Sequence, residues 1–430
     1  MIGWVAIIRL GLVQAGLGAV VVLVTSTLNR VMIVELGLPA LVSGSLVALH
    51  YGVQALRPRL GYGSDVGGRR TPWILGGMAM LALGASGAAA SVGLMAEAPV
   101  LGVSAAAVAF LAVGLGVGAA GTSLLTLLAS AVAPRRRGPA ATIVWIMMIA
   151  GIAVTATLAK GWLNPFSAGR LFQVVSLVGI TAFGVAVLAV WGIERGVTTA
   201  PSTAPLTMPP TAHGGFLSAL RSVWAEPQAR RFAIFVFVSM LAYSAQELVI
   251  EPFAGAVFGL APGASAGLTG QHHAGVLVGM AGVAVASFAM GGMSGARGWT
   301  MGGCLGSAVA VLCVAWCGLA GAGDWLAPAV VVLGVANGVF AVAAIGAMMG
   351  LAGEGRAGTR MGLWGAAQAL AFGAGGLFGT GMSDAARAVI AAPALAYSAV
   401  FLTQAALFLT AAWLAAGVFG AARRPVLAMA

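Results

Sequence analysis

Residues 61–70 decide how the rest of the chain is interpreted, and they read Gly61-Tyr62-Gly63-Ser64-Asp65-Val66-Gly67-Gly68-Arg69-Arg70. The stretch lies between two apolar segments, so it predicts a short loop joining two membrane-spanning helices. Its glycines permit a tight turn, and its arginines favour the cytoplasmic side of a membrane. The Asp65 carboxylate would be stabilised by the amino terminus of another helix. We therefore expect a cytoplasmic gate motif made of Gly61, Asp65, Gly68, Arg69 and Arg70.

The composition of the chain indicates a membrane protein. Of its 430 residues, 60% are hydrophobic and only 7% are charged, whereas a soluble domain carries about 25% charged residues. So few charges could not cover the surface of a water-soluble protein of this length. A helix needs about 20 apolar residues to cross the hydrocarbon layer. The chain is long enough for about twelve such helices with short connections.

Apolar stretches place these helices along the chain, separated by glycine, proline and charged residues. We expect them at residues 7–28, 40–57, 72–94, 101–131, 140–162, 171–192, 232–255, 274–294, 300–320, 327–351, 361–381 and 393–419. The long connection after the sixth span begins with a Thr- and Pro-rich linker and continues with an amphipathic segment, which fits a short helix on the membrane surface. The chain thus divides into a six-helix half at 1–195, a cytoplasmic linker with a surface helix at 196–230, and a six-helix half at 231–430.

The distribution of basic residues predicts the orientation, because cytoplasmic loops carry most Lys and Arg residues. With both termini in the cytoplasm, the cytoplasmic loops and tail hold 16 of the 21 Lys and Arg residues. The other side holds only four, which are Arg30, Lys160, Arg170 and Arg387. We therefore expect an N-in, C-in protein. The net charge of +11 does not point to nucleic acid, because the charges sit singly in short loops.

Ionisable residues in apolar spans are costly in lipid, so they mark candidate functional positions. Asn29 and Arg30 end the first span, whereas Gln246, Glu247 and Glu251 lie in the seventh. If a pseudo-two-fold axis relates the halves, these two helices occupy equivalent places. Aligning the two segments puts Asn29 on Gln246 and Arg30 on Glu247. We expect Arg30 to pair with Glu247 or Glu251 at the non-cytoplasmic end of a central cleft; the alternative is that Arg30 caps its helix and faces water.

Further polar residues in the spans could coordinate the magnesium of a chlorophyll-type ring, since imidazole and amide groups can do so. They are Gln14, His50, Gln368 and the pair His272-His273, expected at the start of the eighth helix. A packing or hydrogen-bonding role is the alternative for each. The chain shows no metal-ligand spacing, phosphate-binding loop or nucleophile elbow, which argues against ATP-driven or hydrolytic chemistry.

The loop at 61–70 resembles the signature of the major-facilitator transporters, G-x-x-x-D-x-x-G-[RK]-[RK], although the position after the aspartate is usually basic and is Val66 here. The resemblance implies an all-α membrane protein of twelve transmembrane helices in two pseudo-symmetric six-helix halves. In that fold Asp65 would meet the amino terminus of helix eleven, near residues 358–361. The equivalent loop of the second half, at 291–298, keeps its glycines and lacks the acidic residue.

Longer stretches resemble one branch of these transporters, the PucC/LhaA family of light-harvesting complex assembly proteins. They are residues 9–14 (RLGLVQ), 28–36 (LNRVMIVEL), 223–230 (VWAEPQAR), 246–255 (QELVIEPFAG) and 362–373 (GLWGAAQALAFG). The family's helix seven usually reads Gln-Asp, and Gln246-Glu247 keeps the charge on a longer arm. The family's proline-containing end of helix two is replaced here by His50-Tyr51-Gly52. The resemblance therefore does not decide which branch of the family, and so which antenna complex, the chain serves.

The resemblance implies a non-enzymatic assembly factor in the inner, intracytoplasmic photosynthetic membrane of a bacterium. It would bind bacteriochlorophyll transiently and deliver it to light-harvesting antenna polypeptides, with bacteriochlorophyll-synthesis enzymes and membrane lipid as further partners. The candidate pigment or cleft residues are Gln14, Asn29, Arg30, His50, Gln246, Glu247, Glu251 and Gln368. Two alternatives stay open. One is a proton-coupled secondary transporter of a small molecule that uses Glu247 or Glu251, and the other is a pigment-free scaffold for antenna peptides and pigment-synthesis enzymes.

Overall fold

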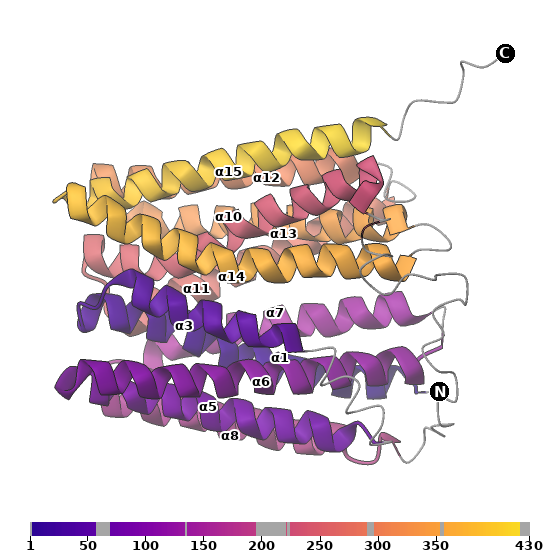
Figure 1. The fold of residues 1–430 in the computed structure, drawn as a ribbon, viewed down its shortest axis with the longest axis horizontal. Coiled ribbons are helices and arrows are strands. Elements are labelled where there is room, and N and C mark those ends of the chain that lie inside the picture. Colours follow the sequence, from indigo (N-terminus) through magenta and orange to yellow (C-terminus); the bar gives the residue numbers. More distant parts are fainter. Residues whose placement is uncertain are drawn as a thin grey trace.

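The computed structural model describes residues 2–56, 69–133, 136–194, 221, 224–289, 296–352 and 357–421. Over these residues the protein is a bundle of long helices that run side by side (Figure 1). In chain order they are α1 (Trp4–Val22), η1 (Leu23–Thr27), α2 (Leu28–Arg30), η2 (Val31–Glu35), α3 (Ala40–Val53), η3 (Gln54–Leu56), α5 (Thr71–Glu97), α6 (Pro99–Ala131), α7 (Arg137–Trp162), α8 (Ala168–Val190), α10 (Pro227–Phe258), α11 (Pro262–Ala289), α12 (Ala296–Ala320), α13 (Gly323–Ala352), α14 (Ala357–Val389) and α15 (Pro393–Ala421).

The run from α1 to η2 is one continuous helix, so the described residues contain the twelve predicted long helices. Two predicted bounds are wrong in ways that matter for function. The first helix continues to Glu35, so Asn29 and Arg30 lie within it rather than at its end. The eighth helix, α11, begins at Pro262 rather than at 274, so His272 and His273 lie in its interior. The hydropathy pattern places the boundaries of both predicted spans at polar residues. In the folded bundle these residues have hydrogen-bond partners, so the helices continue through them.

The helices pack as two groups with equivalent neighbours. In the first group α1 packs on α7 and α8, α5 packs on α6 and α8, and α3 packs on α6. In the second group α10 packs on α14 and α15, α12 packs on α13 and α15, and α11 packs on α13. Every contact in one group has its counterpart in the other when the six helices are matched in chain order. A pseudo-two-fold axis produces this arrangement.

The two groups meet along α7 with α11 and along α3 with α14, which are themselves equivalent pairs. The start of α1 and the end of α15 lie at the same end of the bundle (Figure 1). We name the opposite end, where η2, α10 and α14 finish, the distal end. That the distal end faces away from the cytoplasm stays a prediction, as do the boundaries of the two halves. Most of the predicted linker and its surface helix lie outside the described residues.

Large apolar side chains cover the outside of the bundle. Leu83, Val108 and Leu188 are 75%, 68% and 72% exposed. Within the described residues, nine helices are long and apolar enough to cross a membrane. In water so much exposed apolar surface would drive association, whereas in a bilayer it contacts lipid. The chain is a multi-pass membrane protein.

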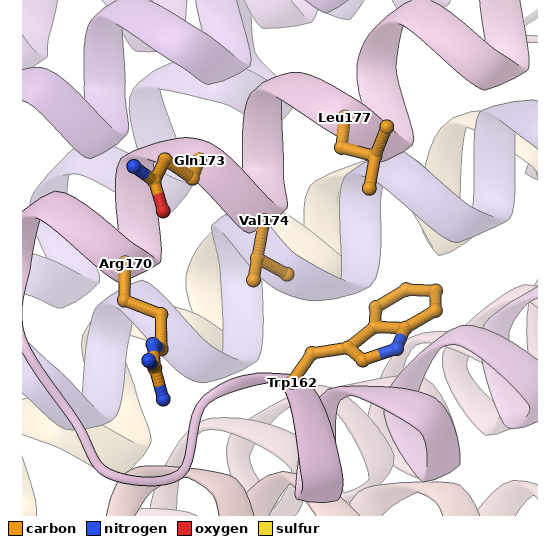
Figure 2. A pocket seen from close by; sticks show the side chains of 5 residues that line it. All are labelled: Trp162, Arg170, Gln173, Val174 and Leu177. Atoms are coloured by element: carbon orange, nitrogen blue, oxygen red, sulfur yellow. The ribbon is translucent and has the colours of Figure 1, made fainter.

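A pocket of about 240 Å³ opens on this outer surface where α7 ends and α8 begins (Figure 2). It is lined by Trp162, Arg170, Gln173, Val174 and Leu177. The Arg170 guanidinium donates to the Asn164 carbonyl at 2.6 Å. Four of the five lining residues belong to α8, whose main neighbours are α5 and α1. The pocket therefore lies outside the interface between the two groups.

Candidate functional site

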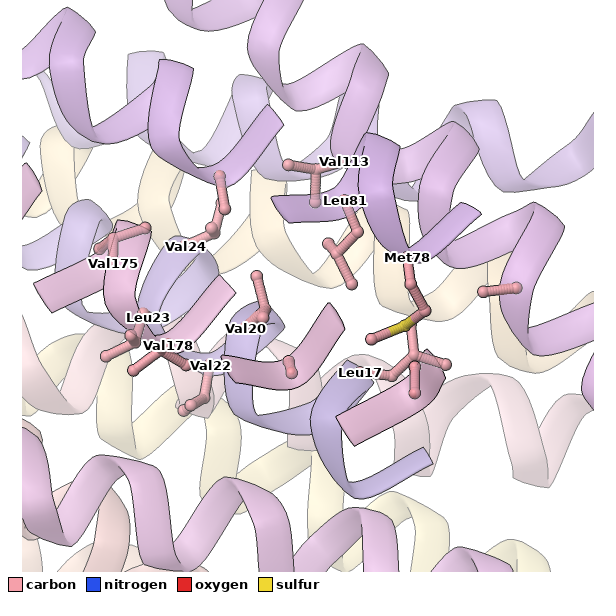
Figure 3. Close-up of a cluster of buried hydrophobic side chains, with 14 of the residues drawn as sticks. Leu17, Val20, Val22, Leu23, Val24, Met78, Leu81, Val113, Val175 and Val178 are labelled. Atoms are coloured by element: carbon pink, nitrogen blue, oxygen red, sulfur yellow. The ribbon is translucent and has the colours of Figure 1, made fainter. Parts of the chain in front are cut away.

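The first helix is held in place by apolar packing within its own group (Figure 3). Its buried contacts include Leu17, Val20, Leu23 and Val24 on one side and Met78, Leu81, Val113, Val175 and Val178 on the other. Because lipid is as apolar as these side chains, close van der Waals packing fixes the helix rather than removal from water. Ser26 and Asn29, which follow Val24, face α10 and α11, as their hydrogen bonds show.

Two π-helical segments, η1 and η2, flank the single turn that holds Asn29 and Arg30. Before η1 ends, the Thr25 hydroxyl donates to the Val21 carbonyl at 3.0 Å. Such back-bonding competes with the backbone hydrogen-bond ladder. Single π turns inside helices are often found at functional sites. The first helix is therefore irregular at the level where it meets the second group.

Asn29 joins the first helix to α10 at a point where α10 lacks a backbone hydrogen bond. Pro252 lies four residues after Leu248 and has no N–H, so the Leu248 carbonyl loses its helical donor. The Asn29 amide donates to this carbonyl, with an Nδ2–O distance of 2.8 Å. The Asn29 oxygen accepts from the Ser43 hydroxyl at 2.7 Å, and both side chains are fully buried. Asn29 thus completes the hydrogen bonding of a proline-containing helix in the other group.

Glu251 is a buried carboxylate that bridges three helices and both groups. Its side chain is only 1% exposed. Its Oε1 accepts from the Ser26 hydroxyl of η1 at 2.6 Å and from the Thr269 hydroxyl of α11 at 2.5 Å. Its Oε2 has no hydrogen-bond partner among the described residues. The carboxylate is therefore held by hydroxyl groups at one oxygen alone.

Arg30 does not form the expected ion pair across the interface. In the described part of the chain its guanidinium pairs with Glu35 of η2, with an Nη1–Oε1 distance of 2.5 Å, and donates to the Leu260 carbonyl beyond α10. The predicted pair with Glu247 or Glu251 is wrong. The alternative of a water-facing arginine is also wrong, because Arg30 is only 2% exposed. The extra helical turn brings Glu35 within reach, and the guanidinium then points toward the distal end.

Gly255 makes room for this guanidinium, since a Cβ atom at residue 255 would lie 2.8 Å from Arg30 Nη2. Gly255→Ala is expected to displace Arg30 from the Leu260 carbonyl and to lower the free energy of unfolding by about 1 kcal/mol. Unfolding of the purified protein in mixed micelles measures this. Gly184→Ala on α8 is the control, because no atom of the described residues lies within 4 Å of its added Cβ. Equal losses in both variants would contradict the prediction.

A second polar cluster lies inside the second group and joins α10, α11, α12 and α13. The Gln246 and Asn337 amide nitrogens lie 3.2 and 3.1 Å from the same nitrogen, His272 Nε2. The Ser307 hydroxyl donates to Asn337 Oδ1 at 2.8 Å, and all four side chains are buried. Because two amides contact His272 Nε2, that nitrogen is not available to a metal ion in this arrangement.

Glu247 is the more open of the two carboxylates on α10. Its side chain is 27% exposed, and its Oε1 lies 3.5 Å from His273 Nε2. The other ring nitrogen, His273 Nδ1, lies 2.9 Å from the Thr269 carbonyl. A carbonyl oxygen only accepts, so Nδ1 carries a proton. Glu247 and Glu251 lie one helical turn apart, and His273 and Thr269 lie one turn apart on α11, so the two pairs face each other.

Six ring side chains, which we name the aromatic series, cross the interface between the groups. In order they are His50, Tyr51, Phe372, Tyr243, His272 and His273, with successive ring centroids 4.9, 5.3, 6.0, 6.3 and 5.0 Å apart. They come from α3, α14, α10 and α11. Tyr51, Phe372 and Tyr243 keep part of their surface exposed. Such rings can pack against a planar apolar ligand.

Gln14 and Gln368 each contact a methionine sulfur, which is a weak acceptor. Gln14 Nε2 lies 3.2 Å from Met148 Sδ, and Gln368 Nε2 lies 3.9 Å from Met240 Sδ. Gln14 Oε1 is buried without a hydrogen-bond partner among the described residues. In contrast, His50 Nε2 lies 3.0 Å from the Gln54 amide.

The structure brings together most of the predicted cleft residues. Asn29, Arg30 and Glu251 lie where the first helix meets α10. Glu247 and Gln246 lie on α10 and contact His273 and His272 of α11, and His50 and Gln368 lie on α3 and α14. Gln14 lies apart and faces α7. Of the predicted gate motif, Gly61, Asp65 and Gly68 lie outside the described residues, so the contact of Asp65 with helix eleven stays a prediction. Arg69 is exposed, and the Arg70 backbone N–H donates to Glu194 Oε1 at 2.6 Å.

Sequence reasoning missed Ser26, Thr269, Ser307 and Asn337. Asn337 carried a usable signal, because it is an amide within an otherwise apolar span. Serine and threonine carried none, since they are common in membrane helices and usually bond to their own backbone.

Comparison with known proteins adds to this geometry. A family model described as PUCC protein matches residues 27–422. The bacteriochlorophyll synthase 44.5 kDa chain of Rhodobacter capsulatus is 52% identical to this chain over 99% of it and 98% of the relative. Protein PucC of Cereibacter sphaeroides is 30% identical over 85% of this chain and 81% of the relative.

Among solved structures, a bacterial homologue of the human lysosomal transporter Spinster, inward-facing and unoccupied, matches with a TM-score of 0.71. It is 15% identical, and the match covers 98% of each chain. At this identity the likeness concerns the fold alone. The predicted major-facilitator fold is confirmed.

Proposed function

The chain belongs to the PUCC protein family, and from this membership we propose that it is an assembly factor for bacterial light-harvesting complexes. Membership and the names of the relatives connect the chain with bacterial photosynthesis. The finer proposal is that it binds bacteriochlorophyll within the bilayer and delivers it to antenna polypeptides. It would do so in the inner, intracytoplasmic photosynthetic membrane, with both termini in the cytoplasm and with pigment-synthesis enzymes as further partners.

The aromatic series is the observation that supports pigment binding best. Bacteriochlorophyll presents a wide, flat and apolar ring, and aromatic side chains pack well against such surfaces. Tyr51, Phe372 and Tyr243 are partly exposed and come from helices of both groups. A ligand held there would contact both groups at once. A change in the relative position of the two groups would then change the affinity for the pigment.

Two buried amide oxygens, one beside the series on α10 and one apart from it on α1, would suit the magnesium ion at the centre of the ring. Magnesium prefers oxygen ligands, and Gln246 Oε1 and Gln14 Oε1 are buried amide oxygens without hydrogen-bond partners in the described residues. Gln246 is the nearer of the two, since its amide nitrogen contacts His272 of the series. Gln246 would therefore hold the metal centre, with Gln14 as the alternative, while His272 orients the Gln246 amide.

Phe372→Ala is expected to weaken bacteriochlorophyll binding by about tenfold, which corresponds to ~1.4 kcal/mol, because it removes the ring that links Tyr51 to Tyr243. Titration of purified protein with bacteriochlorophyll, followed by pigment absorbance and induced circular dichroism, measures this. Phe172→Ala on α8 is the matched control, since Phe172 is 42% exposed on the outer surface. Identical binding curves for the two variants would contradict a role of the aromatic series in pigment binding.

The rival functions predict different results with the wild-type protein. A colourless protein whose deletion still abolishes the antenna complex would favour a pigment-free scaffold. Substrate-dependent proton flux in liposomes would favour a secondary transporter. The name of the Rhodobacter capsulatus relative attributes it to a synthase, whereas we propose a non-enzymatic role for this chain. Pigment synthesis by the purified protein alone would contradict that role.

A further inference from the structure

We propose that Glu251 is a proton-binding site, and that its protonation loosens the contact between the two helix groups at the distal end. The inference goes beyond pigment binding and does not depend on it. It rests on the hydrogen bonds, burial and neighbours of one carboxylate.

Glu251 sits where an ionised carboxylate is costly. Its side chain is 1% exposed, and Oε2 meets no hydrogen-bond donor among the described residues. Burying a charge without a partner in direct contact carries a large desolvation penalty, and membrane proteins keep such groups chiefly at pathways and relays. Oε1 accepts from two hydroxyls while Oε2 is left over, so Oε2 is the atom that takes the proton.

Basic side chains from two other helix segments lie close to the Glu251 carboxylate. In the described residues, Arg30 from α2 pairs with Glu35 and His273 from α11 faces Glu247, so neither is in ion-pair contact with Glu251. Glu247 lies one turn away on the same helix. Glu251 therefore has basic side chains close by, and within the part of the chain that the structure describes neither of them is in ion-pair contact with it. A tight ion pair with Arg30 would hold Glu251 in its ionised form, but the Arg30 guanidinium pairs with Glu35 instead.

Two protonatable side chains, Glu247 and His273, lie beside the residues that hold Glu251. Glu247 is 27% exposed and contacts His273 Nε2 at 3.5 Å. His273 is linked through its other nitrogen to the Thr269 carbonyl, and the Thr269 hydroxyl donates to Glu251. A proton taken up at Glu247 lies one helical turn from Glu251 on α10, and one taken up at His273 lies one turn from Thr269 on α11. No other reactant is needed, since the proton comes from water and returns to it.

The same carboxylate holds the two groups together. Ser26 belongs to the first group, whereas Glu251 and Thr269 belong to the second, and the Ser26 hydroxyl donates to Oε1 at 2.6 Å. A hydrogen bond to an ionised acceptor is about twice as strong as one to a neutral acceptor. Protonation therefore weakens the link between Ser26 and Glu251. Deprotonation strengthens it and favours closure of the distal end.

Infrared difference spectra of the purified protein in lipid, recorded between roughly pH 5 and pH 9, test the site. Wild-type protein should show the carbonyl band of a buried carboxylic acid, and Glu251→Gln should lack it. Glu97→Gln, at an exposed carboxylate at the end of α5, should keep it. Ser26→Ala should move the band to higher frequency, because the carbonyl loses a hydrogen bond. Persistence of the whole band in Glu251→Gln, or no band in wild type, overturns the proposal.

Spin-label distances test the coupling. Residues Val100 and Val389 are 83% and 84% exposed at the distal ends of the two groups, and labels there, with the three native cysteines replaced by alanine, report on closure. The distance should widen at low pH in wild type and lose its pH response in Glu251→Gln. A pH-independent distance in wild type overturns the coupling. The same widening on sodium removal at fixed pH would identify a cation site instead and overturn the proton assignment.

Discussion

Asn29→Leu is expected to lower the free energy of unfolding by about 2 kcal/mol, because it leaves the buried Leu248 carbonyl without a hydrogen-bond donor. The Pro252 ring has already removed the helical donor of that carbonyl, and in lipid no water replaces it. Asn29 supplies the missing bond at 2.8 Å from the opposite helix group. The substitution also removes the acceptor of the Ser43 hydroxyl. Reversible unfolding in mixed micelles measures the loss.

A double-mutant cycle with Pro252→Ala separates these two contributions. An alanine there restores a backbone N–H four residues after Leu248, so the carbonyl regains a partner within its own helix. Asn29→Leu should then cost about 1 kcal/mol less than it does with proline present. The Ser43 contribution is the same in both backgrounds. An equal cost in both backgrounds would mean that Asn29 does not act by satisfying the carbonyl that proline exposes.

The fold was predictable because lipid imposes simple constraints on sequence. Every backbone polar group must be satisfied within a helix, so apolar length alone located the twelve spans. The helix ends were less predictable, because hydropathy treats a polar residue as a boundary. Glu35, His272 and His273 are polar and lie inside helices, since Arg30, the Gln246 amide and the Thr269 carbonyl give them partners. Only tertiary structure provides those partners.

The helices that form the candidate site were predictable, whereas the side chains that pair within it were less so. The symmetry argument correctly placed Asn29 and Arg30 against the helix of Glu247 and Glu251, as the Asn29 bond to Leu248 shows. It failed for the ion pair, because matching positions along two sequences does not determine side-chain direction. The direction of Arg30 depends on the space at Gly255 and on the carbonyl of Leu260. Neither is visible as a charge pattern.

Asp384→Ala is expected to shift the distal end toward an open state by about tenfold, or ~1.4 kcal/mol. The carboxylate of Asp384, on α14, accepts from the Ala40 and Leu41 backbone N–H groups of α3 at 2.8 and 2.7 Å. The N-cap residue of α3 is Pro39, which has no capping side chain. The free N–H groups at the start of α3 therefore depend on a carboxylate from the other helix group, where the helix dipole also favours negative charge.

This cap acts together with close packing just below it. A Cβ atom at Gly44 of α3 would lie 1.9 Å from the Thr380 hydroxyl of α14, so the two backbones approach closely only while the halves are closed. Loss of the cap should widen the distance between labels at residues 100 and 389, and Asp384→Asn, which keeps one acceptor oxygen, should widen it less. Glu194→Ala is the control, because Glu194 caps α5 within the first group in the same way. Since that cap does not cross the interface, Glu194→Ala should lower stability without changing the label distance. An unchanged distance in Asp384→Ala would show that side-chain packing alone keeps the distal end shut.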